Sequence, residues 1–198
     1  VRLSSERKAA WLAGRVAAKR AIRSLWLRER AELLAYHDIR IEYDERGAPI
    51  VVSHPLALSI SHTGPYGLAA VAGQHPGLSL GVDIERVRSF ERTVTEAFLS
   101  KREREWCEYA GQEKNAEISL FWSYKEAYLK ALGVGLRKHP RTVKVFPDSL
   151  KGAILKNLRH QGHQGVGREV TLPGLEGKYV ATVVTVRRPV SVEKNNEE

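Results

Sequence analysis

The sequence predicts an α+β fold in which two halves, each a small antiparallel sheet packed with helices, lie side by side. The order of the elements supports this, because the first half reads as a helix and then strands, and the second as a strand, helices and strands. With 198 residues, 42% hydrophobic and 28% charged, the chain can build one substantial core or two small cores packed together. We expect one domain, 1–198, with halves at about 1–80 and 81–188 and a frayed polar tail at 189–198.

The first half opens with one long helix over residues 4–36, a segment of good helix formers without proline. Ser4 or Ser5 can serve as its N-cap. Small residues and a leucine recur at spacings of three and four and suit close packing: Gly14, Ala17, Ala18, Ala21 and Leu25. Basic residues fall on a different face, where solvated surface is the ordinary interpretation: Lys8, Arg15, Lys19 and Arg23.

Five strand-like runs follow this helix. Residues 39–52 read as two strands around a turn at 44–47, and residues 56–73 as two more around 62–67. Residues 78–87 supply a further strand, whose hydrophobic alternation places one side of it toward a core.

Two helices and further strands complete the second half. We expect helices at 90–110 and 116–132, the second closed by Gly133 and Gly135. Strands are expected at 143–146, 168–172 and 178–188, with a turn or mobile loop at 160–167. The single cysteine, Cys107, excludes an internal disulfide and a cysteine metal cage, and we expect a partly buried apolar side chain.

The chain carries 32 Lys and Arg against 23 Asp and Glu, a formal net charge of +9 that should attract anions. Its basic residues form no long block and no nucleic-acid recognition motif is present, so we expect no nucleic-acid partner. No apolar run approaches the roughly 20 residues that cross a bilayer, and the start lacks a signal-peptide core, so we expect a cytoplasmic protein without a membrane partner. A start at Val1 and the absence of Met indicate a processed or excised piece of a longer polypeptide.

The segment Gly81-Val82-Asp83-Ile84-Glu85 carries two acidic residues at strand spacing. Side chains at i and i+2 share one face of a strand, so Asp83 and Glu85 project the same way with Cα atoms about 7 Å apart. Converging carboxylate oxygens suit Mg²⁺ shared with substrate phosphates. Taken alone, the pattern is more typical of an edge strand whose outer face is wet or paired with Arg86 and Arg88.

A second polar group lies on the predicted helix at 116–132. At 100° per residue its core face collects Phe121, Tyr124, Tyr128 and Ala131. The opposite face collects Trp122, Glu126 and Lys130, so that a carboxylate and an ammonium lie one turn apart. Either this is a routine i,i+4 ion pair, or Glu126 is a third metal ligand or a base and the lysines neutralise a reacting phosphate.

The segment 59–64 combines hydroxyls, an imidazole and exposed backbone N–H groups at a strand end. Ser59, Ser61 and His62 lead into a turn that begins near Gly64. Such an arrangement can hold phosphate, although a histidine in a turn is more often ordinary surface.

In this order the segments resemble the phosphopantetheinyl transferase superfamily, and within it the surfactin-synthetase-activating (Sfp-like) type, over about residues 12–186. The sequence GVDIE at 81–85 resembles the family's metal-binding motif. The sequence FWSYKEAYLKALGVGL at 121–136 resembles its W-S-x-K-E-[SA]-x-x-K motif. Two further matches are AFLSKREREW at 97–106 and ISHTG at 60–64.

The resemblance implies two α+β halves related by a pseudo-twofold, with coenzyme A in the cleft between them. Asp83, Glu85 and Glu126 would hold Mg²⁺, or Mn²⁺, on the pyrophosphate of coenzyme A. Lys130 would lie near the α-phosphate and stabilise the departing 3′,5′-ADP, and Lys125 would help to bind the phosphates. A serine hydroxyl of the acceptor would attack the β-phosphorus in line, with Asp83, Glu126 and Lys130 as the catalytic residues and Glu126 or a metal-bound water as the base.

The nucleotide end of coenzyme A is expected to contact Ser61 and His62. Members of the family usually have a further N-terminal strand and basic segment, which this chain lacks, so the candidates for the 3′-phosphate are Arg15, Lys19 and Arg20. Gly47-Ala48-Pro49 replaces the G-K-P found in many relatives, and Arg46 is a candidate for the lost charge. Trp11 stands where relatives often have a small or polar residue.

The implied partner is an acidic acyl or peptidyl carrier protein, whose charge complements this chain. We expect it to dock near Phe98, Arg102, Trp106, Arg86 and Arg88. A monomer is expected, because two halves in one chain can build the cleft. The competing interpretations are a non-catalytic coenzyme A-binding or carrier-protein-binding domain of a synthase, and a binder of nucleic acid or polyphosphate driven by charge.

Overall fold

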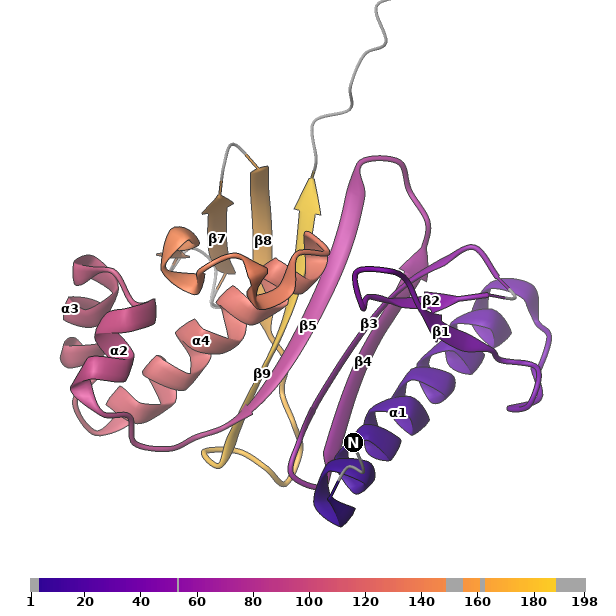
Figure 1. Cartoon of the computed structure of the whole chain (residues 1–198), viewed down its shortest axis with the longest axis horizontal. Coiled ribbons are helices and arrows are strands. Elements are labelled where there is room, and N and C mark those ends of the chain that lie inside the picture. Colours follow the sequence, from indigo (N-terminus) through magenta and orange to yellow (C-terminus); the bar gives the residue numbers. More distant parts are fainter. Residues whose placement is uncertain (1–3, 53, 149–154, 161–162, 188–198) are drawn as a thin grey trace, which may run out of the picture.

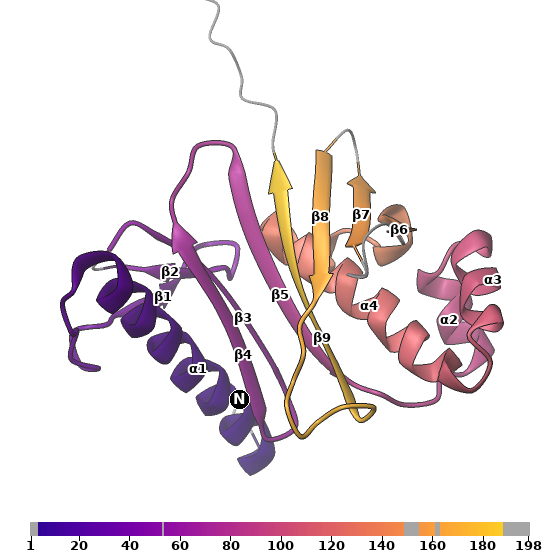
Figure 2. The ribbon, with the colours of Figure 1, turned by 180° about the vertical axis from the view of Figure 1, so that it is seen from behind.

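Two long helices flank the strands of the molecule. The structure is a computed structural model that describes residues 4–52, 54–148, 155–160 and 163–187. Figure 1 and Figure 2 show the strands of both halves meeting at the centre, with α1 (Ser5–Arg30) on one side and α4 (Lys114–Ala131) on the other. This arrangement confirms the α+β class with small antiparallel sheets. The pseudo-twofold stays a prediction, and the expected tail at 189–198 lies outside the described residues.

The ends of α1 are fixed by local hydrogen bonds. Ser4 Oγ accepts a hydrogen bond from the Arg7 backbone N–H at 3.3 Å, which confirms Ser4 as the N-cap. The helix ends at Arg30, earlier than predicted, because Ala31 takes a left-handed conformation with φ of 55°. The N–H of Ala31 then bonds to the Leu27 carbonyl and closes the last turn.

The first hairpin joins β1 (Ile41–Tyr43) to β2 (Pro49–Val51). Asp44 holds the predicted turn, because its Oδ1 accepts hydrogen bonds from the Arg46 N–H at 2.9 Å and the Ala48 N–H at 2.7 Å. The turn is therefore fixed by an aspartate side chain that the sequence places at its start.

The second hairpin joins β3 (Leu56–Thr63) to β4 (Tyr66–Gly73). Its turn is shorter than predicted, because pairing continues to Thr63 opposite Tyr66. Gly64 supplies the positive φ of 52° that so tight a turn requires.

Close packing of α1 on this hairpin uses Gly14, Ala18 and Leu25 of the predicted stripe, whereas Ala17 and Ala21 are only partly buried. The buried face of the helix consists of Ala10, Gly14, Ala18, Ile22 and Leu25. On the strand side, Gly67 faces the backbone of Ala13 and Gly14, where an added Cβ would overlap the helix. A glycine at this position therefore sets how near the helix and strand can lie.

The C-terminal half contains one antiparallel sheet in the order β5-β9-β8-β7-β6. Its strands are β5 (Leu78–Arg86), β6 (Lys144–Asp148), β7 (Leu155–His160), β8 (His163–Glu169) and β9 (Tyr179–Arg187). Among the described strands, β5 is at the edge of this sheet and has β9 as its one backbone partner, from Leu78 opposite Arg187 to Arg86 opposite Tyr179.

The turn or loop that the sequence predicts at 160–167 is wrong for most of its length. Its residues belong largely to β8, which pairs with β7, a strand that the sequence did not reveal. The glycines are needed because aromatic rings of α4 lie on this face: Gly165 faces the Tyr128 ring and Gly167 the Tyr124 ring. Glycines that would end a strand in isolation are here imposed by the packing of a helix.

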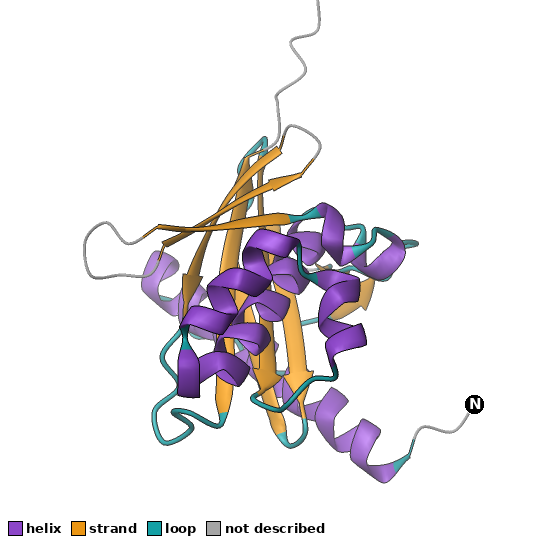
Figure 3. Cartoon of the chain, turned by 90° about the vertical axis from the view of Figure 1, so that its left-hand side faces the viewer, coloured by secondary structure: helices purple, strands orange, loops and turns teal. Residues whose placement is uncertain are grey.

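One helix, α4, packs on the sheet, and two shorter helices lie beside α4. The helix predicted at 90–110 is two helices, α2 (Arg92–Phe98) and α3 (Lys101–Tyr109). The break occurs because Ser100 begins a new helix, with a capping box in which Ser100 and Glu103 each bond the other's backbone N–H. Figure 3 shows the helices of this half in front of the strands. In the part of the chain that the structure describes, no helix is both long and apolar enough to cross a membrane.

Each half has its own hydrophobic core. One cluster joins α1 to the first four strands, and the other, which contains buried Cys107, joins α4 to the five-stranded sheet. β3 and β5 lie side by side where the halves meet. On its other side β5 approaches α4 so closely that a Cβ at Gly81 would overlap the Ala127 carbonyl.

Candidate active site

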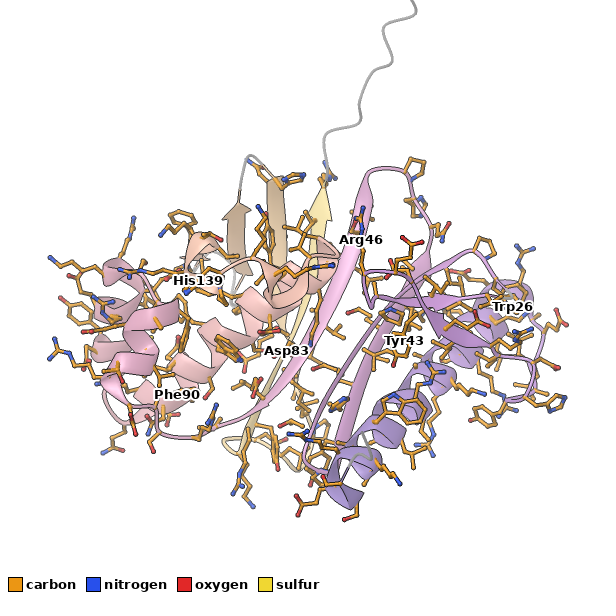
Figure 4. All side chains as sticks on the ribbon, in the orientation of Figure 1. Trp26, Tyr43, Arg46, Asp83, Phe90 and His139 are labelled. Atoms are coloured by element: carbon orange, nitrogen blue, oxygen red, sulfur yellow. The ribbon has the colours of Figure 1, made fainter. Side chains whose placement is uncertain are left out.

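The acidic residues of β5 share one face of the strand, as their alternation predicts, and in the structure this face lies against α4. Gly81 contacts the α4 backbone, so Asp83 and Glu85 on the same face point toward the helix. Val82 and Ile84 are buried on the opposite face. Asp83 is only 3% exposed, and Figure 4 shows it at the centre of the molecule. The outer edge of β5 is therefore a buried junction between the halves and not a wet surface.

Asp83 Oδ1 on β5 accepts hydrogen bonds from side chains of two other elements, α4 and β3. The Lys130 ammonium donates to it at 2.7 Å, and the Ser61 hydroxyl donates to it at 2.8 Å. Lys130 Nζ also lies 3.0 Å from Ser61 Oγ. The structure thus brings together two predicted phosphate-binding residues and one predicted metal ligand.

Glu85 is held by the indole of Trp122, which donates to its Oε1 at 3.1 Å. The pKa of Glu85 is raised to about 7, first by burial and then by the charges of Asp83 and, less strongly, Glu126, whereas the Trp122 indole and Lys130 lower it. Glu85 therefore lies among carboxylates whose charges repel one another.

Glu126 completes the acidic group from α4. Burial raises the pKa of Glu126, Lys130 opposes this, and Asp83 adds to it. Among the described residues, Glu126 Oε1 and Asp83 Oδ2 are buried oxygens without a hydrogen-bond partner. Such atoms are costly to bury unless a cation or donor satisfies them.

These carboxylates fit a divalent cation in chemistry. Asp83, Glu85 and Glu126 offer oxygen ligands only, two of which have no partner, and within the described ranges Lys130 is the one ammonium that bonds to the group. No three His, Cys, Asp or Glu side chains among the described residues form a preassembled metal cage. Shared binding of one ion by these three acids stays a prediction.

A cavity of about 270 Å³ adjoins this group and has walls from both halves. Arg46 and Tyr43 of the first hairpin, His62 of β3 and Lys130 of α4 all line it. A larger cavity of about 650 Å³ shares Arg46 and Lys130 with it. Arg137 links the halves here, because its Nη2 donates to the Arg46 carbonyl at 3.4 Å. The predicted residues Arg46, His62 and Lys130 are therefore neighbours of one cavity.

The basic residues of α1 are placed differently. Arg15 Nη2 donates to the Ile41 carbonyl at 2.5 Å, and its guanidinium lies over the rings of Trp11 and Tyr43. Lys19 Nζ donates to the Tyr36 carbonyl at 2.6 Å.

Arg20, on the same helix, is exposed and lies beside the Tyr36 side chain. Together with Arg15 and Lys19 it fastens the segment after α1 to the helix. None of the three lines the cavity of about 270 Å³, so the structure does not bring the expected 3′-phosphate residues to it.

The expectation that Lys125 helps to bind the phosphates is wrong for this structure. Its side chain is 0% exposed. The ammonium bonds to Glu103 Oε2 at 2.9 Å and to three backbone carbonyls: Phe98 at 2.9 Å, Pro140 at 3.4 Å and Val143 at 2.8 Å. Burial lowers the pKa of Lys125, and the Glu103 charge opposes this. Lys125 therefore holds α2, α4 and the segment after α4 together.

Glu103 is a residue that sequence reasoning missed. Its Oε2 accepts from the Ser100 N–H at 2.6 Å as well as from Lys125, and its Oε1 accepts from the Val145 N–H at 2.9 Å. The capping-box pattern of a serine followed three residues later by a glutamate could have marked it. Nothing local could have shown that it binds Lys125, because 22 positions separate the two in sequence.

The residues near which the acceptor is expected to dock differ in exposure, and the docking surface itself stays a prediction. Arg102 and Trp106 are exposed on α3, and Arg88 is exposed and lies over the Phe90 ring with its guanidinium 4.7 Å from the centroid. Phe98 is only 3% exposed and belongs to the core, so it supports the surface from beneath and offers almost no area to a partner.

Comparison with known proteins identifies relatives of this chain. A model of the 4′-phosphopantetheinyl transferase superfamily matches residues 79–184, more than half of the chain. The chain is 31% identical over 102 residues to 4′-phosphopantetheinyl transferase gsp of Aneurinibacillus migulanus, which covers 50% of this chain and 40% of that protein. It is 31% identical over 103 residues to 4′-phosphopantetheinyl transferase Sfp of Bacillus subtilis (strain 168), with 50% and 43% covered.

A shorter relative matches over part of the same region. Holo-[acyl-carrier-protein] synthase of Geobacillus sp. (strain WCH70) is 41% identical over 73 residues, which cover 35% of this chain and 61% of that protein. Among solved structures, the holo-[acyl-carrier-protein] synthase of Thermotoga maritima matches with a TM-score of 0.44 and 17% identity over 56% of this chain and 63% of that one. The matched segment thus spans less than half the length of the two transferases.

Proposed function

The chain belongs to the 4′-phosphopantetheinyl transferase superfamily. From this premise we propose that it transfers the 4′-phosphopantetheine group of coenzyme A to a serine hydroxyl of an acyl or peptidyl carrier protein. The reaction would release 3′,5′-ADP. One observation supports this proposal most. Asp83, Glu85 and Glu126 gather with Lys130 beside a cavity that both halves line. Carboxylates that can hold a cation, together with a lysine, are the groups that bind a diphosphate and neutralise its charge.

Coenzyme A would occupy the cavity between the halves. His62 and Arg46 line it and would meet the nucleotide end, where a cationic or hydrogen-bonding side chain can contact phosphate. Ser61 lies deeper, bonded to Asp83 and Lys130, and would meet the phosphates nearest to the reacting phosphorus.

Asp83, Glu85 and Glu126 would hold Mg²⁺, with Mn²⁺ as a substitute. When bound, the ion supplies charge neutralisation of the pyrophosphate and helps to align it. The excess of acidic over basic groups and the two unpartnered oxygens support these three residues as its ligands.

The side chains would divide the work of the transfer. Lys130, now on Asp83, would turn its ammonium to the phosphate that leaves with 3′,5′-ADP and stabilise the charge that develops there. Glu126 would accept the proton of the attacking serine, for which a raised pKa is favourable.

The carrier protein would dock on the C-terminal half, beside α2 and α3. Exposed Arg88, Arg102 and Trp106 offer positive charge and an aromatic contact to an acidic partner. A cavity of about 630 Å³ between α2, α3 and the start of α4 also presents Arg92 and Lys101 on this side. We further propose that the protein acts as a cytoplasmic monomer, since one chain supplies both walls of the cleft.

Intact-mass measurement tests the activity. The protein is incubated with coenzyme A, Mg²⁺ and an apo carrier protein, and the carrier should gain the mass of one phosphopantetheine group. EDTA or Asp83→Ala should abolish the gain, whereas Asp38→Ala, which removes an exposed aspartate of the N-terminal half, should leave it unchanged. Binding of coenzyme A without modification of any of several carriers would contradict the enzyme and favour a binding domain.

A further inference from the structure

Side-chain hydroxyls join the halves along the free edge of β5. β5 has no backbone partner on this edge among the described residues, and its neighbour β3 supplies serines at alternate positions. The Val82 N–H donates to Ser59 Oγ at 3.0 Å, and the Ile84 N–H donates to Ser61 Oγ at 3.4 Å. Both serines are buried, at 4% and 6% exposed. The two hydroxyls thus take the place of the carbonyls that a further paired strand would offer.

The two serines differ in what else they bind. Ser61 also bonds to Asp83 and Lys130, so its loss would disturb the reacting group directly. Ser59 has the Val82 N–H as its only side-chain hydrogen bond within the part of the chain that the structure describes. Val82 immediately precedes Asp83, so this bond sets where the backbone that carries the carboxylate lies.

We propose that Ser59 is a positioning residue for the Asp83 carboxylate, an inference that rests on the proposed function. Ser59 acts through the Val82 amide: it fixes β5 against β3, while Gly81 fixes the same strand against α4. Between these two contacts Asp83 Oδ1 accepts hydrogen bonds from Lys130 and Ser61, and its buried Oδ2 has no hydrogen-bond partner among the described residues. Loss of the Ser59 acceptor leaves a buried N–H unsatisfied and frees β5 to shift.

Metal affinity, measured apart from turnover, tests this role. Titration of the purified protein with Mn²⁺, followed by electron paramagnetic resonance, reports the acidic group without coenzyme A or a carrier. Ser59→Ala should weaken Mn²⁺ binding roughly three- to tenfold, the range for loss of one buried hydrogen bond. Ser59→Cys, similar in size but a weak acceptor, should behave like Ser59→Ala, and Ser59→Thr, which keeps the hydroxyl, should restore the affinity.

Ile22→Val is the matched control. Ile22 is fully buried in the core of the same half, and its truncation lowers stability without touching β5. It should leave Mn²⁺ affinity unchanged. Hydrogen exchange of the Val82 amide should be faster in Ser59→Ala and not in Ile22→Val.

Two results would overturn the inference. In one, Ser59→Ala and Ser59→Cys bind Mn²⁺ as tightly as the unaltered protein. In the other, they weaken only coenzyme A binding, which would make Ser59 a direct contact in the cavity that it lines. Failure of the unaltered protein to modify any carrier would instead contradict the proposed function, and the Mn²⁺ comparison would still decide the role of Ser59.

Discussion

Buried acidic groups outnumber the cations that neutralise them at the junction of the halves. Asp83 has Lys130, but Glu85 has only an indole N–H among the described residues, and Glu126 retains an unpartnered oxygen. The raised pKa of both glutamates follows from burial first and mutual repulsion second. Repulsion of this kind, stored in the metal-free protein, is released when a cation binds.

Glu85 should therefore make the metal-free protein less stable as the pH rises. Its pKa is about 7 in the folded protein and 4.5 in the ordinary state, so the folded state holds more protons between these values and the free energy of unfolding falls from pH 4.5 to 7. Glu85→Gln should recover on the order of 1–3 kcal/mol above pH 7, measured by urea unfolding in EDTA. Exposed Glu45→Gln is the control, and an identical pH profile for Glu85→Gln and the unaltered protein would contradict burial of a carboxylate as the cause.

Lys125 shows the opposite situation, a buried charge whose partners are all present. Lys125→Met should lower the free energy of unfolding by about 3–5 kcal/mol, because Glu103 loses its ionic partner and three buried carbonyls lose a donor. Lys101→Met is the matched control: its ion pair with Glu105 spans 3.9 Å at the surface and should matter by less than about 0.5 kcal/mol. Equal losses in the two variants, by urea unfolding, would show that Lys125 is not a structural centre.

The acidic group and Lys125 together show what sequence could and could not predict at the site. Asp83 and Glu85 follow a strand period, and Glu126 and Lys130 follow a helix period, so their common orientation could be predicted locally. Lys125 is adjacent to Glu126 in sequence, but its side chain points to a different face of α4. Its burial depends on Glu103 and on the segment after α4. Partners so far away in sequence leave no local signal.

At the scale of elements, caps and glycines separate the correct predictions from the wrong ones. Helix and strand periods located most elements, but they missed the break between α2 and α3, the strand β7 and all but the end of β8. Ser100 is an N-cap inside a helical pattern, and the glycines of β8 are read as a loop unless the rings of Tyr124 and Tyr128 are known to face them. Tertiary packing here overrides local preference.

Gly167 should consequently tolerate no side chain. A Cβ there would lie 2.5 Å from the Tyr124 ring, which is fully buried and cannot move aside freely. Gly167→Ala should cost about 1–3 kcal/mol, as overpacking of a core does. Gly73→Ala, at a strand position with open space and ordinary backbone, is the control and should be near neutral by thermal unfolding. A neutral Gly167→Ala would mean that α4 and β8 do not pack this closely.

At the scale of the whole molecule, two cores are linked by a few specific contacts. The serine bonds between β3 and β5, the contact of the Tyr66 and Tyr179 rings at 4.9 Å, and the bond from Arg137 to the first hairpin all cross the junction. The sequence predicted two halves but offered no indication of these contacts, because each joins residues far apart in the chain.

Because the site needs both halves, we expect them to unfold together. Single-tryptophan variants that retain either Trp26 in α1 or Trp122 in α4 should give coincident fluorescence transitions in urea, with one midpoint. Ser59→Ala should lower both midpoints equally. Two separated transitions would contradict a cooperative junction and indicate halves that fold as separate units.

The contact between Gly81 and the α4 backbone has a practical consequence for such experiments. A shift of β5 by two residues would bring Ser79 or Asp83 to the position of Gly81, where the α4 backbone leaves no room for a Cβ. The strand therefore has one possible register against the helix. The spacing between the acids of the strand and those of the helix is consequently dictated by backbone shape. Asp83→Asn should therefore remove a charge without changing the spacing between β5 and α4. The effect of this variant can then be attributed to the charge alone.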